Sequence, residues 1–235
     1  MKKLLIASTS TVHGKAYLEY LLPDLKIFFK DVETILFIPF ARPSGLTHDE
    51  YTEKVSCVFA SIDKKVVGLH TFNDPIEALK NAKGIFVGGG NTFVLVTELY
   101  RRGILETLFQ VVDKGTPYFG TSAGSNITGV TMMNTNDMPI MYPPSFVTLG
   151  LISFNLNPHY LDPDPNSTHM GETRETRIKE FHCFNHTPVL GLREGSWLAV
   201  EGDKVTLKGS LKARLFRENL EPVELETGSD LSDLK

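Results

Sequence analysis

The stretch Pro117-Tyr118-Phe119-Gly120-Thr121-Ser122-Ala123-Gly124 places a G-x-S-x-G pentapeptide directly after a short apolar run. The apolar run is typical of a buried strand, and the residues after the pentapeptide favour a helix. In that context the turn from strand to helix is tight and strained, and small neighbours keep it free of clashes. The pattern predicts that Ser122 is a nucleophile at the carboxyl edge of an α/β sheet, although a glycine-flanked serine can also be purely structural.

Apolar runs of the same kind recur along the chain and alternate with stretches that favour helices. Several runs are apolar at every position, as in strands of a parallel sheet covered by helices on both faces. The alternation predicts a three-layer α/β sandwich with a mostly parallel sheet. The predicted strands are Leu4–Ala7, Thr34–Phe40, Val66–Leu69, Gly84–Val87, Tyr118–Gly120, Ile152–Leu156 and Val189–Leu192. The predicted helices are Val12–Leu22, ending before Pro23, then His48–Asp63, Pro75–Ala82, Thr92–Arg101 and Leu105–Lys114.

The last forty or so residues change character. Gly202-Asp203 is a two-residue hairpin signal between the apolar runs Leu198–Glu201 and Val205–Lys208, and Ala213–Phe216 can add a third strand. We therefore expect a small antiparallel edge after the α/β core. No linker separates two domains, so residues 1–217 are expected to form one domain, and the acidic tail 218–235 is expected to fray.

Composition excludes several classes of protein. The 235 residues carry 24 Lys and Arg against 28 Asp and Glu, a formal charge of −4, without the basic stripe that nucleic acids require. No apolar run approaches the roughly 18 residues of a membrane span. Cys57 and Cys183 each stand alone, which argues against a disulfide framework or a zinc site. We expect a cytoplasmic protein that binds neither nucleic acid nor membrane, and a homodimer remains open.

A second glycine-rich turn, Val87-Gly88-Gly89-Gly90-Asn91, also follows a predicted strand and precedes a predicted helix. Three glycines cost folding entropy, so a local requirement is expected. The turn could bind phosphate at a helix N-terminus, or it could simply need positive φ. It could also supply the Gly90 N–H to an oxyanion hole, together with the N–H of Ala123 just after the predicted nucleophile.

A serine nucleophile needs a base, and His159 is the favoured histidine by position. It ends Asn155-Leu156-Asn157-Pro158-His159, at the carboxyl end of a predicted strand, where catalytic groups of open α/β sheets collect. Two acids could orient its imidazole: Glu194, immediately beyond another predicted strand, and Asp137, in a loop after the nucleophile's helix. Spacing alone does not choose between them, and either could instead cap backbone N–H groups.

At these residues the chain resembles the peptidase E family of serine peptidases, family S51. The matching blocks run in order over nearly the whole chain, which is far more specific than the pentapeptide alone. Two positions depart mildly from the family pattern, Thr121 before the serine and Arg193 before Glu194. The matching blocks are Ile38–Ala41, Val87–Phe93, Gly120–Asn126, Thr135–Ile140, Asn157–His159, Gly171–Glu175 and Glu194–Gly195.

The resemblance implies a class I glutamine-amidotransferase-like fold and hydrolysis of dipeptides with an N-terminal aspartate, without metal or cofactor. Carried over to this sequence, it implies Ser122 as nucleophile, His159 as base and Glu194 as the third catalytic residue. Gly90 and Ala123 would then form the oxyanion hole. Asp137 would shape the pocket or bind the free ammonium of the substrate.

The aspartyl side chain of such a substrate must meet a cation, because a buried, unpaired carboxylate is costly. Arg174 is our candidate, since a guanidinium binds a carboxylate through two hydrogen bonds. The alternative is that Arg174 belongs to a solvated, ion-paired helix face. Two rival functions also remain: a peptidase for β-linked aspartyl peptides, as in the related cyanophycinases, and a non-catalytic binding domain on the same scaffold.

Overall fold

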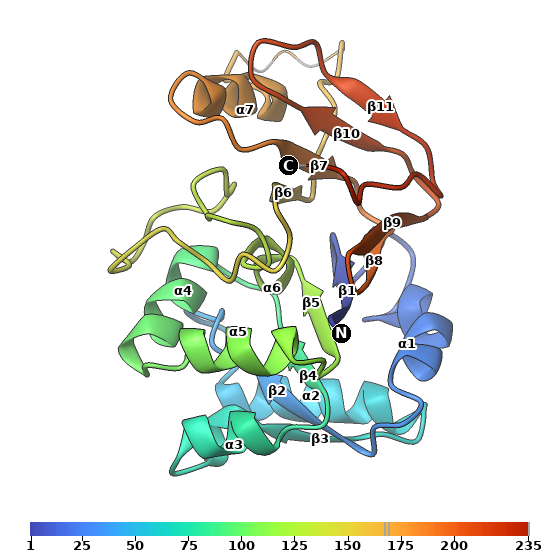
Figure 1. Cartoon of the computed structure of the whole chain (residues 1–235), viewed down its shortest axis with the longest axis vertical. Helices are drawn as coiled ribbons and strands as arrows, with labels where there is room; N and C mark the ends of the chain where they lie inside the picture. Colours follow the sequence, from blue (N-terminus) through green and yellow to red (C-terminus); the bar gives the residue numbers. More distant parts are fainter. Residues whose placement is uncertain (167, 169, 235) are drawn as a thin grey trace.

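The structure, a computed structural model, describes residues 1–166, 168 and 170–234. Its larger sheet has seven strands, of which the first five in spatial order are parallel and the last two antiparallel (Figure 1). The predicted hairpin therefore forms the antiparallel edge of this sheet. The strand order is β3 (Lys65–Gly68), β2 (Thr34–Ile38), β4 (Ile85–Val87), β5 (Tyr118–Thr121), β1 (Lys3–Ala7), β8 (Ser196–Glu201) and β9 (Lys204–Gly209).

Helices cover both faces of this sheet, and the alternation along β1 shows how. Leu5 and Ala7 point into one apolar cluster with α1 and α2, whereas Leu4 and Ile6 point into another with α3, α4 and α5. The three-layer sandwich predicted from the sequence is thereby confirmed. None of the described helices is long and apolar enough to span a membrane. The covering helices are α1 (Leu22–Phe28), α2 (His48–Ala60), α3 (Pro75–Asn81), α4 (Thr92–Arg101) and α5 (Leu105–Asp113).

A second sheet of four strands lies at the upper end of the molecule in Figure 1. Its order is β11 (Val223–Leu225), β10 (Ala213–Phe216), β7 (Val189–Leu192) and β6 (Asn155–Pro158). Strands β6 and β7 are parallel, and helix α7 (Arg174–His182) packs on this sheet through Ile178 and Phe181. The prediction that β10 extends the hairpin is wrong: β10 pairs with β7, because the chain leaves the first sheet after β9.

The prediction of a helix over Val12–Leu22 is wrong. Residues 12–21 form turns and a single 3₁₀ turn, η1 (Glu19–Leu21), and helix α1 begins at Leu22 with Pro23 in its first turn. Proline fits the first turn of a helix, where its missing N–H has no partner to lose. Pro23 therefore marks the start of a helix and not the end of one.

The tail from Glu218 does not fray. Strand β11 pairs with β10, and the side chain of Leu231 is only 4% exposed. The Leu207 N–H donates to the Ser229 carbonyl at 3.0 Å, and the Leu231 N–H donates to the Val205 carbonyl at 2.8 Å. Acidic composition suggested solvation, but the apolar residues of the segment and the free edge of β9 hold it in place.

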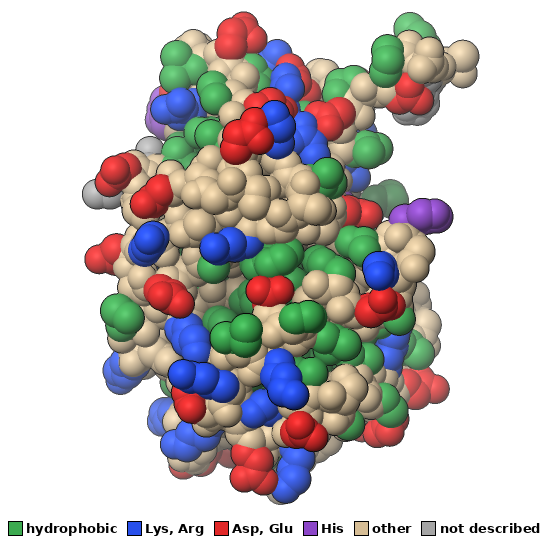
Figure 2. All heavy atoms as spheres, turned by 90° about the vertical axis from the view of Figure 1, so that its right-hand side faces the viewer, with side chains coloured by type: hydrophobic (Ala, Val, Ile, Leu, Met, Phe, Trp, Pro, Cys, Tyr) green, Lys and Arg blue, Asp and Glu red, His purple; other side chains and the backbone are tan. Residues whose placement is uncertain are grey.

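One face of the molecule leaves apolar side chains exposed. On the side that carries α1 and the β8–β9 hairpin, apolar side chains gather in the middle and charged side chains surround them (Figure 2). A groove there is lined by Phe28, Trp197 and Ala199 together with Lys3 and Lys208. Helix α1 is too short to cover the whole outer surface of the hairpin.

Candidate active site

Ser122 lies in the sharp turn between β5 and the short helix α6 (Ala123–Asn126), with φ of 53° and ψ of −112°. This conformation is strained for a residue with a side chain. Both glycines of the pentapeptide are needed for close packing. A Cβ at Gly120 would lie 2.5 Å from the Gly124 carbonyl oxygen, and one at Gly124 would lie 2.2 Å from the Val87 carbonyl oxygen. The turn therefore has the geometry of a nucleophile elbow.

The structure brings Ser122, His159 and Glu194 into one hydrogen-bonded chain. His159 follows β6 and Glu194 follows β7, so neighbouring parallel strands present both side chains at the same edge. His159 Nε2 lies 2.8 Å from Ser122 Oγ, and Nδ1 lies 2.7 Å from Glu194 Oε1. A carboxylate that accepts from Nδ1–H leaves Nε2 as the acceptor of the serine proton.

The backbone of His159 is held by a residue that the sequence analysis did not single out. His159 has a φ of 55°, and its N–H donates to the Ser8 hydroxyl at 2.9 Å. That hydroxyl donates in turn to the Leu192 carbonyl at 2.7 Å. Ser8 thus links β1 of the large sheet to β6 and β7 of the small one. Its position just after a predicted strand was the available signal.

The glycine-rich loop after β4 lies against the nucleophile. A Cβ at Gly89 would lie 3.0 Å from Ser122 Cβ, and a Cβ at Gly90, whose φ is 151°, would lie 2.2 Å from the Ala41 carbonyl oxygen. Within the described part of the chain, neither the Gly90 N–H nor the Ala123 N–H donates to a protein acceptor. Both donors are therefore available beside Ser122, as an oxyanion hole requires.

A cavity of about 170 Å³ opens beside Ser122 and His159. Arg174, in the first turn of α7, and Asp137 both line it. Burial lowers the pKa of the Arg174 guanidinium, the nearby Arg177 lowers it further, and Asp137 acts in the opposite direction. The cavity is lined by Thr92, Ser122, Ala123, Asn126, Thr135, Asn136, Asp137, Pro158, His159 and Arg174.

Arg174 differs from its neighbours on α7. Glu175 and Lys179 form the ion pair expected of a solvated helix face, at 2.9 Å. Among the described residues, no carboxylate lies within ion-pair distance of Arg174. Its half-buried guanidinium therefore faces the cavity with its hydrogen-bonding capacity available, and the exposed-face alternative applies to the rest of the helix.

Asp137 lies away from the histidine. Its Oδ2 accepts from the Thr92 N–H at 2.7 Å and from the Thr135 hydroxyl at 3.3 Å, so the carboxylate caps the N-terminus of α4. Of the two acids that the sequence left open, Glu194 is the one in contact with His159. Asp137 instead adds negative charge to the cavity wall opposite Arg174.

The amide side chains around β6 were not predicted to be part of the site. Asn136 donates from Nδ2 to the Pro158 carbonyl at 3.0 Å, which holds the loop of Asp137 against the strand that leads to His159. Asn126 donates from Nδ2 to the Leu156 carbonyl at 3.3 Å, while its buried Oδ1 has no protein donor within the described residues. Asn126, which also lines the cavity, therefore has a buried acceptor without a partner among the described residues.

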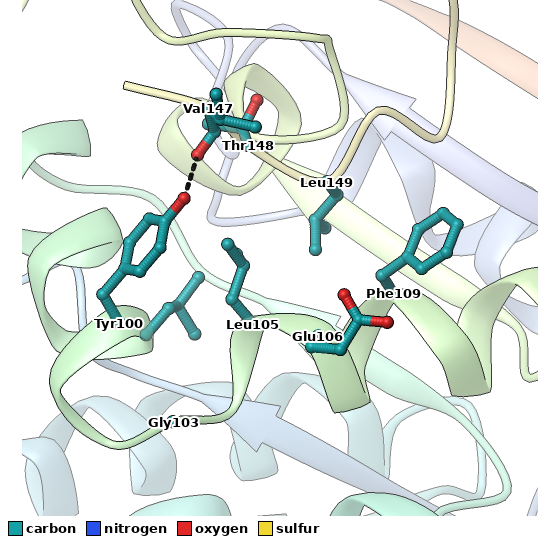
Figure 3. Close-up of a pocket in the computed structure, with 9 residues that line it drawn as sticks. Tyr100, Gly103, Leu105, Glu106, Phe109, Val147, Thr148 and Leu149 are labelled. Atoms are coloured by element: carbon teal, nitrogen blue, oxygen red, sulfur yellow. Dashed lines mark hydrogen bonds between the residues drawn. The ribbon is translucent and has the colours of Figure 1, made fainter. Parts of the chain in front are cut away.

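A larger cavity lies elsewhere and has a different lining. About 430 Å³ in volume, it lies between the α4–α5 turn and residues 147–149, where the Tyr100 hydroxyl donates to the Val147 carbonyl (Figure 3). Apart from Glu106 its walls are mostly apolar, without a nucleophile or a base. Within the described residues, no group of three or more His, Cys, Asp or Glu side chains is arranged to hold a metal ion.

Comparison with known proteins identifies the family of the chain. The model of peptidase family S51 matches residues 4–208. The chain is 51% identical over 231 residues to peptidase E of Streptomyces coelicolor, covering 98% of this chain and 94% of that protein. It is 45% identical over 236 residues to the Drosophila melanogaster protein named "Probable alpha-aspartyl dipeptidase", covering 99% of this chain and 97% of the relative.

A solved structure shares the fold. The crystal structure of a peptidase from an acI-B1 Actinobacterium superposes with a TM-score of 0.73 at 16% identity, covering 98% of this chain and 96% of that one. At that identity the match supports the fold alone. The family match and the two relatives confirm the resemblance that the sequence blocks indicated. The chain therefore belongs to peptidase family S51.

Proposed function

We propose that this chain is a serine-type dipeptidase that hydrolyses dipeptides with an N-terminal L-aspartate through an acyl-enzyme. The observation that carries the proposal is the hydrogen-bonded chain from Ser122 through His159 to Glu194, beside a cavity whose wall holds Arg174. The names of the relatives, peptidase E and alpha-aspartyl dipeptidase, support the same class of substrate.

The proposed mechanism begins at Ser122. Its Oγ bonds to the carbonyl carbon of the aspartyl residue as its proton passes to His159 Nε2, and Glu194 stabilises the imidazolium that forms. The carbonyl electron pair moves onto oxygen, where the N–H groups of Gly90 and Ala123 donate to it. The oxyanion collapses, the C–N bond breaks, and Nε2 protonates the leaving amine. Water then hydrolyses the acyl-enzyme by the same proton route.

The cavity accounts for an aspartyl preference. Arg174 binds the side-chain carboxylate of the substrate, because its guanidinium offers two parallel donors and no described carboxylate competes for them. Asp137 and the Oδ1 of Asn126 are acceptors suited to the free ammonium. A cavity of about 170 Å³ suits one small side chain and excludes bulky ones.

The first experiment measures hydrolysis of α-Asp-X, β-Asp-X, Glu-X, Asn-X and Ala-X dipeptides by the wild type and by Ser122→Ala, with a chelator present. The matched control is Ser61→Ala, an exposed serine at the end of α2. We expect cleavage of α-Asp-X alone, lost in Ser122→Ala and retained in Ser61→Ala. Preferential cleavage of β-Asp-X would favour the cyanophycinase-like alternative. Absence of cleavage, with no labelling by a serine-directed phosphonate, would favour a binding domain.

A further inference from the structure

The scissile bond divides an Asp-X substrate into two halves that need different surroundings. The aspartyl half is accounted for by the cavity that lies beside α4 and α6. The leaving residue X needs a place outside this cavity, and the glycine-rich loop that carries Gly90 also borders Ser122, because a Cβ at Gly89 would lie 3.0 Å from Ser122 Cβ. The β2–α2 connection packs directly against that loop, and it leads to helix α2 in the opposite layer of the sandwich.

Arg42 belongs to the β2–α2 connection. It follows Ala41, whose carbonyl oxygen accepts from the Asn91 N–H at 2.7 Å and leaves no room for a Cβ at Gly90. The Arg42 guanidinium carbon lies 4.7 Å from the ring centroid of Tyr51. The Tyr51 hydroxyl donates to the Gly89 carbonyl at 3.3 Å. Arg42 is therefore stacked on a ring that is itself bonded to the loop beside Ser122.

This guanidinium has unused hydrogen-bonding capacity. Across the described residues, no carboxylate lies within 4 Å of Arg42, and its buried Nε has no acceptor. A second cation lies in the same layer: Lys54 Nζ is 4.6 Å from the ring centroid of Tyr17 and also forms no ion pair there. Buried donors without acceptors are uncommon and mark places where a ligand can bind.

We propose that Arg42, supported by Lys54, binds the free α-carboxylate of the leaving residue and so restricts the enzyme to dipeptides. The inference rests on the proposed function. One residue spans about 3.8 Å between Cα atoms, so the carboxylate of a dipeptide lies close to the reacting carbonyl and within reach of a side chain beside the glycine loop. A carboxylate desolvated there needs a cation, and a stacked guanidinium is oriented for two-point binding before the substrate arrives.

The test compares the dipeptide Asp-Leu with its C-terminal amide, Asp-Leu-NH₂. We expect the wild type to bind the acid with a KM about tenfold lower than the amide, since a hydrogen-bonded charge pair contributes about that much. In Arg42→Gln the KM for the acid rises about tenfold, kcat changes little, and the amide is unaffected. Arg42→Lys, which keeps the charge and loses the two-point geometry, lies between. The control is Arg101→Gln, an arginine on α4 whose side chain is 62% exposed.

Two results would overturn the inference. Equal KM values of the wild type for acid and amide would exclude a carboxylate subsite, and this comparison needs no variant. An equal loss on both substrates in Arg42→Gln would show that Arg42 only supports the glycine loop, which a thermal melt of the variant would reveal separately. If neither substrate is cleaved by the wild type, the proposed function fails, and with it the inference that rests on it.

Discussion

Arg193 donates two hydrogen bonds to the carboxylate of Asp162, each of 2.8 Å, from Nε and Nη2. It donates two more to Glu224 of β11, at 2.8 and 2.9 Å. Arg193 directly precedes Glu194, so these bonds fix the end of β7 from which the glutamate reaches His159. The residue that departs from the family pattern thus has a structural role in this chain.

The same network continues toward the cavity. Glu224 also accepts from Arg214 Nη1 at 3.2 Å, and Arg214 Nη2 lies 2.9 Å from Glu175. Glu175 directly follows Arg174. A continuous series of ion pairs therefore connects the end of β7, which is followed by the proposed triad residue Glu194, to the helix turn that carries the proposed specificity residue Arg174.

Replacing Arg193 by glutamine should destabilise the protein. Its side chain is only 15% exposed, and its loss leaves Asp162 without an ion-pair partner among the described residues and Glu224 with Arg214 alone. Because those carboxylates are themselves partly exposed, we expect the free energy of unfolding to fall by about 2 kcal/mol, less than for a fully buried pair. Urea denaturation measures it. Lys65→Gln, which breaks an exposed pair with Glu33, should leave stability unchanged within error.

Stability should also fall in acid through this network. The Arg193 hydrogen bonds lower the pKa of Asp162 below its ordinary value of 3.8 and that of Glu224 below 4.5. A carboxylate with a depressed pKa in the folded state contributes stability above its ordinary pKa and loses it as the pH falls through the depressed one. The urea concentration at the unfolding midpoint should therefore decrease as the pH is lowered below about 4. This decrease should be smaller in Arg193→Gln. An equally steep drop in the variant would assign the acid sensitivity to other groups.

The two acids that the sequence could not separate should behave differently on substitution. In Glu194→Gln the imidazole loses its orienting carboxylate, so kcat should fall by about 10²- to 10⁴-fold with little change in KM. In Asp137→Asn the amide oxygen can still accept from the Thr92 N–H, so α4 stays capped and kcat should be nearly kept. Only KM should rise, as the ammonium loses a counter-charge. Steady-state kinetics of both variants on one Asp-X dipeptide distinguish the two roles. The reverse pattern would make Asp137 the carboxylate that orients His159.

Arg174→Gln should raise the KM for Asp-X substrates by tenfold or more, because the aspartyl carboxylate then enters the cavity without a cation. Relative to Asp-X, cleavage of Asn-X should improve, since an amide needs no counter-charge. Arg177→Gln, an exposed arginine one turn further along α7, is the matched control. Unchanged selectivity between Asp-X and Asn-X in Arg174→Gln would remove Arg174 from the site.

Gly90→Ala should raise the activation free energy of catalysis by more than it lowers the free energy of unfolding. The new Cβ would lie 2.2 Å from the Ala41 carbonyl oxygen, so the loop must shift and carry the Gly90 N–H away from the oxyanion. Loss of one such donor costs about 10²- to 10³-fold in kcat. Gly103→Ala is the control, because Gly103 also has positive φ (64°) but open space around it. Its kcat should remain that of the wild type.

Much of this arrangement could be predicted because it depends on local sequence. Asn91 and Asp74 directly precede the predicted helices and accept from first-turn N–H groups of α4 and α3, and the turn at Ser122 follows from its flanking glycines. The order of strands within a sheet depends on contacts between residues that are far apart in sequence. The pairing of β10 with β7 and the link through Ser8 are of this kind.

Pro23 shows a different limit. A proline is compatible both with the residue after a helix and with its first turn, and only packing decides between them. Leu18, at φ of 58°, breaks the chain direction, and Leu21 and Leu25 are then buried against the sheet. For the acids, their positions in the sequence predict both Glu194 and Asp137 near the carboxyl edge of the sheet. The N–H of Thr92, not any feature of the pentapeptide, determines where Asp137 points.

The proposed nucleophile and its proposed base follow strands of different sheets. Ser122 follows β5 of the seven-stranded sheet, whereas His159 and Glu194 follow neighbouring strands of the four-stranded one. The 2.8 Å hydrogen bond between Ser122 and His159 thus crosses from one sheet to the other, whereas the hydrogen bond from His159 to Glu194 lies within the four-stranded sheet. A displacement of one sheet relative to the other by about 1 Å would break the hydrogen bond between Ser122 and His159 and leave the histidine–glutamate pair intact. Catalysis in this fold therefore depends on how firmly the two sheets are fastened to each other, and Ser8, which bonds the His159 N–H and the Leu192 carbonyl, is one of the residues that fastens them.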